Sequence, residues 1–324
     1  MTSWLLRRLM QALMVVTVVS MIVFAGVNVI GDPVEILISP EATQIEREQI
    51  ITRLGLDQPI WKQYLAFVGN ALQGNLGNSF VYNEPALDLV FSRLPATLEL
   101  AFCAMLLGSL IGIPLGLFCG LYPDSKLSRL IMAGSILGFS LPTFWVGIIF
   151  IIVFSVHFGW LPSGGRGETV EFLGTRWSFL TLDGLQHLIL PAINLALFKI
   201  SMILRLTRAG TRETLSMDFI KFARAKGLKP RRIIGVHLMK SIMIPIVTVV
   251  GLEFGSVIAF AVVTESIFAW PGMGKLIIDS IYVLDRPVIV AYLIMIAVLF
   301  VVINLLVDVL YATLDPRVRV GGAA

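Results

Sequence analysis

The chain alternates between long apolar stretches and shorter polar segments. Each of the six longest apolar stretches reaches the length of about 20 residues that a helix needs to cross the hydrocarbon core of a bilayer. They cover residues 9–30, 96–121, 130–156, 185–204, 242–264 and 288–311. The pattern therefore predicts an all-α polytopic membrane protein with six transmembrane helices.

The first apolar stretch follows Arg7 and Arg8, as the apolar region of a signal peptide would follow its positive start. It is too long for a signal peptide, and no Ala-x-Ala cleavage site closes it before Asp32 and Pro33. We therefore expect residues 1–31 to form an N-terminal transmembrane helix.

Composition excludes a soluble globular domain. Hydrophobic residues make up 57% of the chain and charged residues 14%, whereas soluble domains carry about a quarter charged residues. The two cysteines, Cys103 and Cys119, lie on the same predicted helix, about 24 Å apart along its axis. That separation is too large for a disulfide, so we expect two packed thiols.

The basic residues predict the orientation, because cytoplasmic loops of membrane proteins hold an excess of Lys and Arg. If Arg7 lies inside, the inner segments hold 16 of the 25 basic residues and four acidic ones. Both termini are then cytoplasmic. The net charge of +4 reflects this one-sided surplus, which faces anionic lipid and docking proteins, and does not indicate nucleic-acid binding.

Two outer segments are longer than simple turns. We expect residues 32–95 to form a small helical extracytoplasmic subdomain, either a solvated cap or a landing surface for an external receptor. Its signals, in chain order, are a helix start at Ser39-Pro40-Glu41, a stop at Gly55, a second start after Asp57 and Pro59, an apolar face of Ile60, Tyr64, Phe67 and Val68, a turn over residues 74–79, and a short helix from Glu84 and Pro85 to Arg93. Residues 159–167, rich in Gly and Pro, are expected to be irregular.

The inner loop between the fourth and fifth stretches, residues 205–241, contains two short helices by its pattern. Ser216 or Asp218 can cap the first, its apolar members are expected at Phe219, Phe222 and Ala223, and Gly227 supplies a left-handed stop. Pro230 then opens the second. The two short helices, joined at Gly227, form a rigid unit that we call the peg. The peg is either a docking element for a soluble partner or an amphipathic segment lying on the bilayer.

Several other classes of protein find no support. No Gly-x-x-x-x-Gly-Lys-[Ser/Thr] loop occurs, so ATP would have to be bound by another chain. His157, His187 and His237 are scattered over opposite membrane faces, which argues against an intramembrane protease or a metal site. A secondary transporter that works alone would be expected to show internal repeats, and none is visible.

The inner loop resembles the coupling loop of ATP-binding-cassette importer permeases. Many of these read Glu-Ala-Ala, three residues, Gly; here Lys221-Phe222-Ala223 and Gly227 fill those places, without the Glu and the first Ala. The long interval from Gly227 to Pro245 resembles the peptide and nickel branch. Other stretches resemble the first (B-type) permease subunit of that dipeptide/oligopeptide family, in order along the chain: residues 54–59, 74–77, 93–99, 140–142, 190–192, 205–208, 264–268, 270–274 and 314–317.

The resemblance implies a type I importer-like fold in which residues 96–320 form a five-helix core. It implies half of the passage of a heteromeric importer of short peptides in a bacterial inner membrane, with a nickel-complex or glutathione importer as the alternative. The implied partners are a second permease, two cytoplasmic ATPase subunits that hold ATP and Mg, and an external peptide-binding protein. The implied ATPase-coupling residues are Asp218, Phe219, Lys221, Phe222, Ala223, Arg224, Ala225, Lys226 and Gly227.

Polar residues inside the apolar stretches need partners, because a charge in the middle of a bilayer is costly. We expect Lys199 and Glu253 to pair across adjacent helices. The weaker alternative is that Glu253 and its neighbours line the passage; the candidates are Ser140, Asn194, Lys199, Glu253 and Ser256. Glu99 is expected at the outer membrane interface. Glycines at every fourth position, Gly108, Gly112, Gly116 and Gly120, predict a flat face for close helix packing, within this bundle or against the partner permease.

Overall fold

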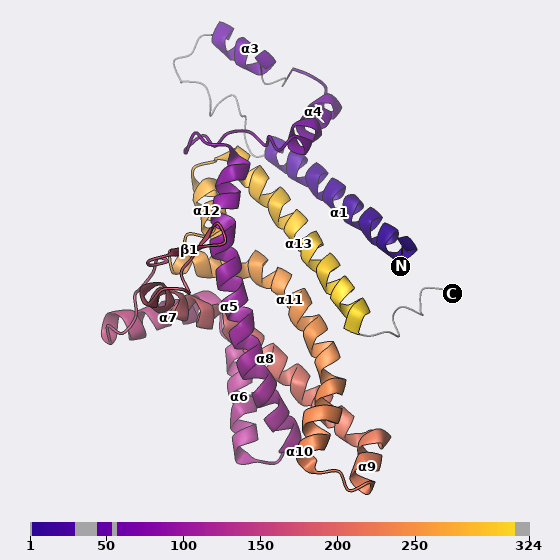
Figure 1. Ribbon diagram of the computed structural model, residues 1–324. Coiled ribbons are helices and arrows are strands. Elements are labelled where there is room, and N and C mark those ends of the chain that lie inside the picture. Colours follow the sequence, from indigo (N-terminus) through magenta and orange to yellow (C-terminus); the bar gives the residue numbers. More distant parts are fainter. Residues whose placement is uncertain (1, 30–43, 54–56, 315–324) are drawn as a thin grey trace. The chain divides into compact units, whose positions relative to one another are not determined.

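The computed structural model describes residues 2–29, 44–53 and 57–314 (Figure 1). The predicted helix start at Ser39-Pro40-Glu41, the stop at Gly55 and the basic tail lie outside these residues. In chain order the helices are α1 (Thr2–Val29), α3 (Gln44–Arg53), α4 (Ile60–Leu72), α5 (Ala86–Leu121), α6 (Lys126–Ser140), α7 (Thr143–Phe150), α8 (Leu182–Ser216), α9 (Asp218–Ala225), α10 (Pro230–Arg232), α11 (Met239–Ile267), α12 (Met273–Tyr282) and α13 (Arg286–Leu314). Two π-helical segments, η1 (Ile151–His157) and η2 (Ile233–Leu238), continue α7 and precede α11.

Five helical segments of the described chain are long and apolar enough to cross a membrane. They are Leu6–Gly26, Ala86–Leu121, Leu182–Ser216, Pro230–Ile267 and Arg286–Leu310. The predicted span over residues 130–156 is not one straight helix, because α6 and the α7–η1 segment meet at an angle of 104°. Counted together as one broken span, these two segments bring the number of candidate spans in the described chain to the predicted six. The break falls at Leu141 and Pro142, where the proline ring disfavours a helical conformation of the residue before it and Leu141 is extended, with ψ at 134°.

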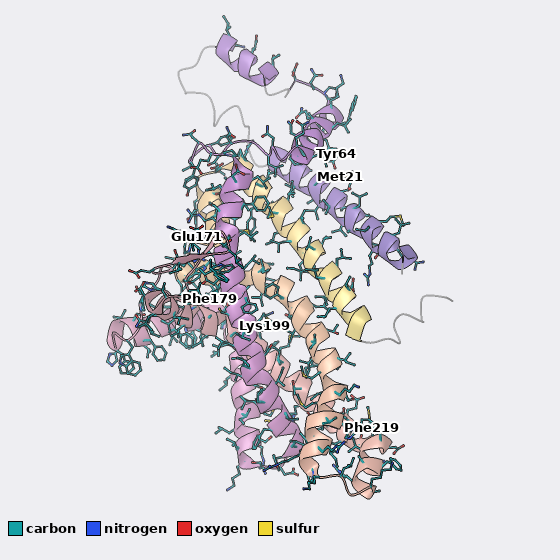
Figure 2. All side chains as sticks on the ribbon, in the orientation of Figure 1. Met21, Tyr64, Glu171, Phe179, Lys199 and Phe219 are labelled. Atoms are coloured by element: carbon teal, nitrogen blue, oxygen red, sulfur yellow. The ribbon has the colours of Figure 1, made fainter. Side chains whose placement is uncertain are left out.

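By its internal contacts the chain divides into two units, Met1–Ser92 with Leu276–Val301, and Arg93–Lys275 with Val302–Ala324. In the first unit α4 packs on α1. Phe24 of α1 meets the rings of Tyr64 and Phe67 at centroid distances of 5.4 and 5.6 Å, and Tyr64 shares a hydrogen bond with Ser20 (2.8 Å). Figure 2 shows Tyr64 at this junction. The predicted start of α4 after Pro59 is thus confirmed. Of its predicted apolar face, Tyr64 and Phe67 contact α1, whereas Ile60 is 72% exposed.

The turn predicted over residues 74–79 is also present in this unit. Gly74 and Gly77 both have positive φ angles, and the turn ends at Ser79, whose hydroxyl donates a hydrogen bond to Asp285. The backbone N–H of Phe80 donates to the same carboxylate (3.2 Å). The short helix expected from Glu84 to Arg93 is not separate, since α5 runs from Ala86 through Pro95 without a break.

In the second unit α8 is the central helix, and α6, α7 and α11 all pack against it. Figure 1 shows α5 crossing α8. The glycine face of α5 makes this crossing: a Cβ added at Gly108 would lie 3.3 Å from the Lys199 side chain, and one at Gly116 would lie 2.5 Å from the carbonyl oxygen of Leu204. Of the two packing roles predicted for these glycines, the structure therefore has the one within this chain.

The outer segment of this unit contains a hairpin that the sequence pattern missed. Strands β1 (Val170–Phe172) and β2 (Thr175–Trp177) pair antiparallel, with Val170 opposite Trp177. Leu173 and Gly174 between them both have positive φ angles, as a two-residue type I′ turn requires. Residues 159–167 have no helix or strand, as predicted.

Glu99 holds this outer segment. Glu99, expected at the outer membrane interface, is 1% exposed and forms an ion pair with Arg166 (2.6 Å). Its other carboxylate oxygen accepts hydrogen bonds from the backbone N–H groups of Ser178 (2.7 Å) and Phe179 (2.9 Å). A buried carboxylate needs such partners, and here they fix the segment that carries the hairpin to α5.

Three stretches that resemble the family, residues 93–99, 264–268 and 270–274, meet at the same end of this unit. Glu265 at the end of α11 accepts a hydrogen bond from the hydroxyl of Thr97 (2.6 Å), which in turn accepts one from the backbone N–H of Met273 (2.8 Å). The indole N–H of Trp270 donates to the carbonyl oxygen of Ala96 (2.9 Å). These contacts join residues 96–97 of α5 to the turn between α11 and α12.

Candidate coupling and transport site

The exposed peg predicted between the fourth and fifth spans is present. Helix α8 continues past the apolar stretch to Ser216, the chain extends at Met217, and α9 follows at once. Gly227 has a φ of 74°, which confirms the left-handed stop, and Pro230 begins α10. The prediction of a Ser216 or Asp218 cap is wrong: Met217 is the N-cap and makes no side-chain cap bond.

The Asp218 carboxylate instead accepts a hydrogen bond from the Lys221 ammonium group (2.9 Å), one turn further along α9. Both side chains are exposed, so the pair contributes little to stability.

The apolar members predicted for α9 divide between its two sides. Ile220 (0% exposed) and Ala223 (5%) pack against Ile233 of η2, with Leu215 and Leu228 beside them. Phe219 and Phe222, which the pattern grouped with Ala223, are 44% and 60% exposed. The interval of three residues from Ile220 to Ala223 places these two side chains on one side of the helix, and this pair takes the buried face because η2 supplies an apolar partner.

The outer side of α9 is both aromatic and basic. Phe219, labelled in Figure 2, Phe222, Arg224, Ala225 and Gly227 are exposed. The ammonium group of Lys226 lies 4.6 Å from the centroid of the Phe222 ring, a cation–π arrangement. Exposed large aromatic rings are characteristic of surfaces that bind a protein partner.

A second apolar cluster connects the peg to the membrane helices. Leu238, Ile242 and Ile246, at the junction of η2 and α11, are 0–2% exposed. They pack with Leu206 and Leu215 of α8 and with Ile113 and Leu117 of α5. Because packed cores deform little, these two clusters join α9 firmly to α8 and α11.

The intramembrane charges form the predicted pair. Lys199 of α8, labelled in Figure 2, places its ammonium group 2.5 Å from a carboxylate oxygen of Glu253 on α11 and 2.9 Å from the hydroxyl of Ser256. The Ser256 hydroxyl also lies 2.8 Å from the same Glu253 oxygen. The Lys199 side chain is 9% exposed and that of Glu253 25% exposed, so one partner of this pair still reaches an open surface.

The remaining passage candidates lie apart from this pair. Asn194 of α8 is fully buried and donates to the hydroxyl of Thr264 (3.2 Å), and its amide oxygen has no hydrogen-bond partner among the described residues. Ser140 is exposed at the end of α6, where its hydroxyl donates to the carbonyl oxygen of Ile136 (2.9 Å). The structure thus brings together Lys199, Glu253 and Ser256.

Neither cysteine forms a disulfide, as predicted. Among the described residues no group of three or more His, Cys, Asp or Glu side chains could hold a metal ion. Thr264, Glu265 and Arg166 are site or scaffold residues that the sequence analysis did not select. The signal for Thr264 and Glu265 was membership of the motif stretch at residues 264–268, whereas Arg166 lies in the loop 159–167, outside the motif stretches.

The described chain thus combines candidate membrane spans with an exposed helix, α9, that is anchored by apolar contacts between two of them, as expected of a membrane protein that docks a soluble partner. The comparison with known families agrees. The model of the binding-protein-dependent transport system inner membrane component matches residues 112–320, and the model of the N-terminal part of such membrane components matches residues 1–101. The chain therefore belongs to the family of binding-protein-dependent transport system inner membrane components.

Curated relatives match over nearly their whole length. The chain is 39% identical to the oligopeptide transport system permease protein AppB of Bacillus subtilis (98% of this chain, 100% of the relative). It is 38% identical to the di/tripeptide transport system permease protein DppB of Pseudomonas aeruginosa (98% and 99%). It is 36% identical to the glutathione transport system permease protein GsiC of Escherichia coli O6:H1 (98% and 99%).

A solved structure shows the same fold. A chain of the MetNI methionine ABC transporter in an inward-facing conformation aligns with 72% of this chain and 99% of its own length, with a TM-score of 0.54 and 17% identity. The predicted family and the importer-permease fold are thus confirmed. The chain is a multi-span, non-catalytic permease component of an ABC transport system, a class that works with ATPase and substrate-binding partners.

Proposed function

We propose that the chain is one permease of an ATP-driven importer of short peptides. A second permease completes the passage, two ATPase subunits hold ATP and Mg on the cytoplasmic side, and an extracytoplasmic protein delivers the peptide. The proposal places both termini in the cytoplasm of a bacterium, in accordance with the excess of basic residues in the inner segments. The peptide cargo is supported by the names of the relatives AppB and DppB.

The main observation behind this proposal is that α9 has one buried side and one exposed side. One side, Ile220 and Ala223, is anchored on η2, while the aromatic side chains of Phe219 and Phe222 remain exposed. A soluble partner can bind the exposed side of a helix anchored in this way, while the buried side stays attached to the spans. In the proposed mechanism, closure of the ATPases on ATP displaces α9, and the two apolar clusters pass this displacement to α8 and α11, which carry Lys199 and Glu253.

The coupling role predicts a specific loss of partners. With Phe219 and Phe222 both changed to Asp, we expect the chain to reach the membrane but no longer to bring ATPase subunits with it when it is purified from native membranes. The measurement is quantitative mass spectrometry of the co-purified proteins, compared with wild type. Two new carboxylates on the docking side remove apolar contact area and place charge in the interface.

The matched control changes Phe172 and Leu173 to Asp. These residues are also exposed and apolar, but they precede α8 whereas α9 follows it, so ATPase recovery should stay at the wild-type level. Wild-type recovery of ATPases with the α9 variant would reject α9 as the coupling element. A wild-type chain that purifies alone would contradict the proposed ATPase partners.

Cargo is tested separately, by uptake. In cells whose only peptide importer contains this chain, we expect its deletion to abolish the accumulation of labelled di- and tripeptides and re-expression to restore it. Glutathione is the second candidate, because the relative GsiC is nearly as similar as the peptide permeases; a nickel complex is the third. Loss of labelled glutathione or nickel uptake with normal peptide uptake would contradict the peptide proposal.

A further inference from the structure

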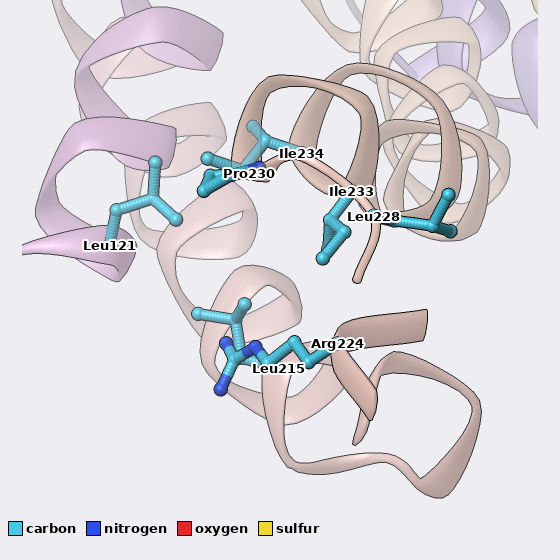
Figure 3. A pocket seen from close by; sticks show the side chains of 7 residues that line it. All are labelled: Leu121, Leu215, Arg224, Leu228, Pro230, Ile233 and Ile234. Atoms are coloured by element: carbon cyan, nitrogen blue, oxygen red, sulfur yellow. The ribbon is translucent and has the colours of Figure 1, made fainter. Parts of the chain in front are cut away.

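The cavity beside the peg belongs to the coupling site already described. It is lined by residues of α8, α9, α10 and η2 and by Leu121 at the end of α5 (Figure 3). Its charged lining residue, Arg224, is exposed on the side of α9 that the proposed function assigns to the ATPase. A different feature of the chain, a second apolar row on α4, has no role in the proposed function.

Helix α4 carries two neighbouring apolar rows. One packs against α1 through the ring contacts described above. The other consists of residues spaced by four, three and four positions, which places them in a line along one side of a helix; they are Trp61, Leu65, Val68 and Leu72. In the described chain Trp61 and Leu65 are each 61% exposed and Leu72 is 84% exposed. This second row therefore presents large apolar side chains that α1 does not cover.

The remaining side of α4 is polar. Lys62 and Asn70 are exposed there. The Lys62 ammonium group lies 5.6 Å from the centroid of the Trp61 ring and 3.5 Å from the amide oxygen of Gln58. Trp beside Lys, where an apolar side of a helix meets a polar one, is typical of a membrane surface, because the indole ring lies at the level of the headgroups and the ammonium group reaches water.

The contact with α1 gives the level of α4 relative to the membrane. Its partners on α1 are Ser20 and Phe24, in the last part of the candidate span Leu6–Gly26. At the rise of an α-helix these two residues lie about 9 and 3 Å before the end of that span. Amphipathic helices at a membrane surface bury their apolar side about 5–10 Å deep, at the boundary of headgroups and acyl chains, which is the same level.

We propose that α4 lies in the interface of the bilayer, with the row of Trp61, Leu65 and Leu72 among the lipid acyl chains and with Lys62 and Asn70 in water. The partner of this row is thus the lipid surface. The proposal rests on α1 crossing the membrane, and on the orientation given above the surface is the outer one. This row of α4 then has neither of the roles predicted for residues 32–95, the solvated cap or the landing surface for a receptor.

The neighbouring surface of α1 supports lipid as the partner. Met21, labelled in Figure 2, and Ile22 lie at the same level as Ser20 and Phe24 and are 50% and 65% exposed. Apolar side chains of a membrane span at this level face lipid. Helix α4 adds its second row to this apolar surface, and it thereby holds the end of α1 at a fixed depth.

The test measures the surroundings of single labels in the full chain reconstituted in vesicles. In a background with Cys103→Ala and Cys119→Ala, a fluorophore is attached at Leu65→Cys or Leu72→Cys in the second row, or at Asn70→Cys on the polar side. Phosphatidylcholine with brominated acyl chains quenches labels that contact lipid, and iodide quenches labels in water. We expect the first two labels to be quenched mainly by the brominated lipid and the label at position 70 mainly by iodide.

A second pair of variants examines the part played by the indole ring. With the label at Leu72→Cys, Trp61→Ala should shift quenching from the brominated lipid towards iodide, because the row loses its largest apolar side chain. Trp61→Phe keeps an apolar ring and should restore most of the lipid quenching. Gel filtration of each labelled variant verifies that the fold is retained.

Two results would overturn the proposal. Stronger quenching by iodide than by brominated lipid at positions 65 and 72 would indicate a solvated cap. Protection of these labels from both quenchers, in the complex purified with its other subunits, would indicate that a protein covers the row. The recovery of ATPases with the α9 variants does not enter either result, so a failure here leaves the proposed function untouched.

Discussion

Gly116→Ala is expected to destabilise the chain by about 1–3 kcal/mol or more, the cost of forcing an extra methyl group into a packed helix contact. The added Cβ would lie 2.5 Å from the carbonyl oxygen of Leu204 and 2.6 Å from the Cβ of Thr207. One of these neighbours is backbone, so α5 and α8 would have to move apart. The measurement is the amount and thermal stability of monodisperse protein extracted from membranes.

Other helix glycines of the same chain serve as controls for this prediction, because they differ in the space available for an added Cβ. At Gly108 an added Cβ would meet its nearest atom, in the Lys199 side chain, at 3.3 Å, which requires a small adjustment. Gly134 of α6 has nothing within 4 Å, so Gly134→Ala should be neutral or stabilising by up to about 1 kcal/mol, the helix-propensity gain of Ala over Gly. Equal stability of the Gly116 and Gly134 variants would contradict the observed crossing of α5 and α8.

Lys199→Met is expected to have the second large effect. It leaves the Glu253 carboxylate without its cation between apolar helices, and removing one partner of a buried pair costs about 3–5 kcal/mol. Since the Glu253 side chain is 25% exposed, the loss should fall at or below the lower end of this range. The exposed pair of Lys221 and Asp218 serves as the control, because Lys221→Met should cost less than about 1 kcal/mol.

The double variant of Lys199 and Glu253, both to Met, decides between the two roles considered for the pair. It removes both charges, so stability should return most of the way to wild type. If peptide uptake returns with it, the pair is structural. If the stable double variant fails to transport, and Glu253→Gln alone also reduces uptake while the complex assembles normally, these side chains act on the cargo in the passage.

The sequence predicts where the helices of this protein begin and end better than it predicts which side of each helix is buried. Gly227 and Pro230 are local signals: glycine favours a left-handed helix stop, and proline favours the first position of a helix. Both predictions are confirmed. Which side of α9 is buried depends on η2, more than ten residues further along the chain, so the local pattern grouped Phe219 and Phe222 with Ala223, which lies on the buried side. The Lys199–Glu253 pair was predictable because a charge among apolar residues must find a partner, and few were available in the spans.

Long-range contacts explain the other differences. The burial of Glu99 depends on Arg166 and Ser178, which lie 67 and 79 positions away, and no local pattern around Glu99 indicates either. The hairpin turn at Leu173-Gly174 lacks the Asn-Gly or Asp-Gly signal of its type. Pro142 marks a discontinuity within an apolar stretch, but a bend of 104° depends on how α6 and α7 pack on α8.

That bend has a consequence for the surrounding lipid. With 15 residues, α6 is about 22 Å long, several ångströms shorter than the roughly 30 Å hydrocarbon core. Beyond Ser140 the chain turns away, so lipid along α6 meets a hydrophobic mismatch, which a bilayer relieves by local thinning. We therefore expect the bilayer to be thinner on the side of α6, and the transport rate to vary with the acyl-chain length of the bilayer in which the permease is reconstituted.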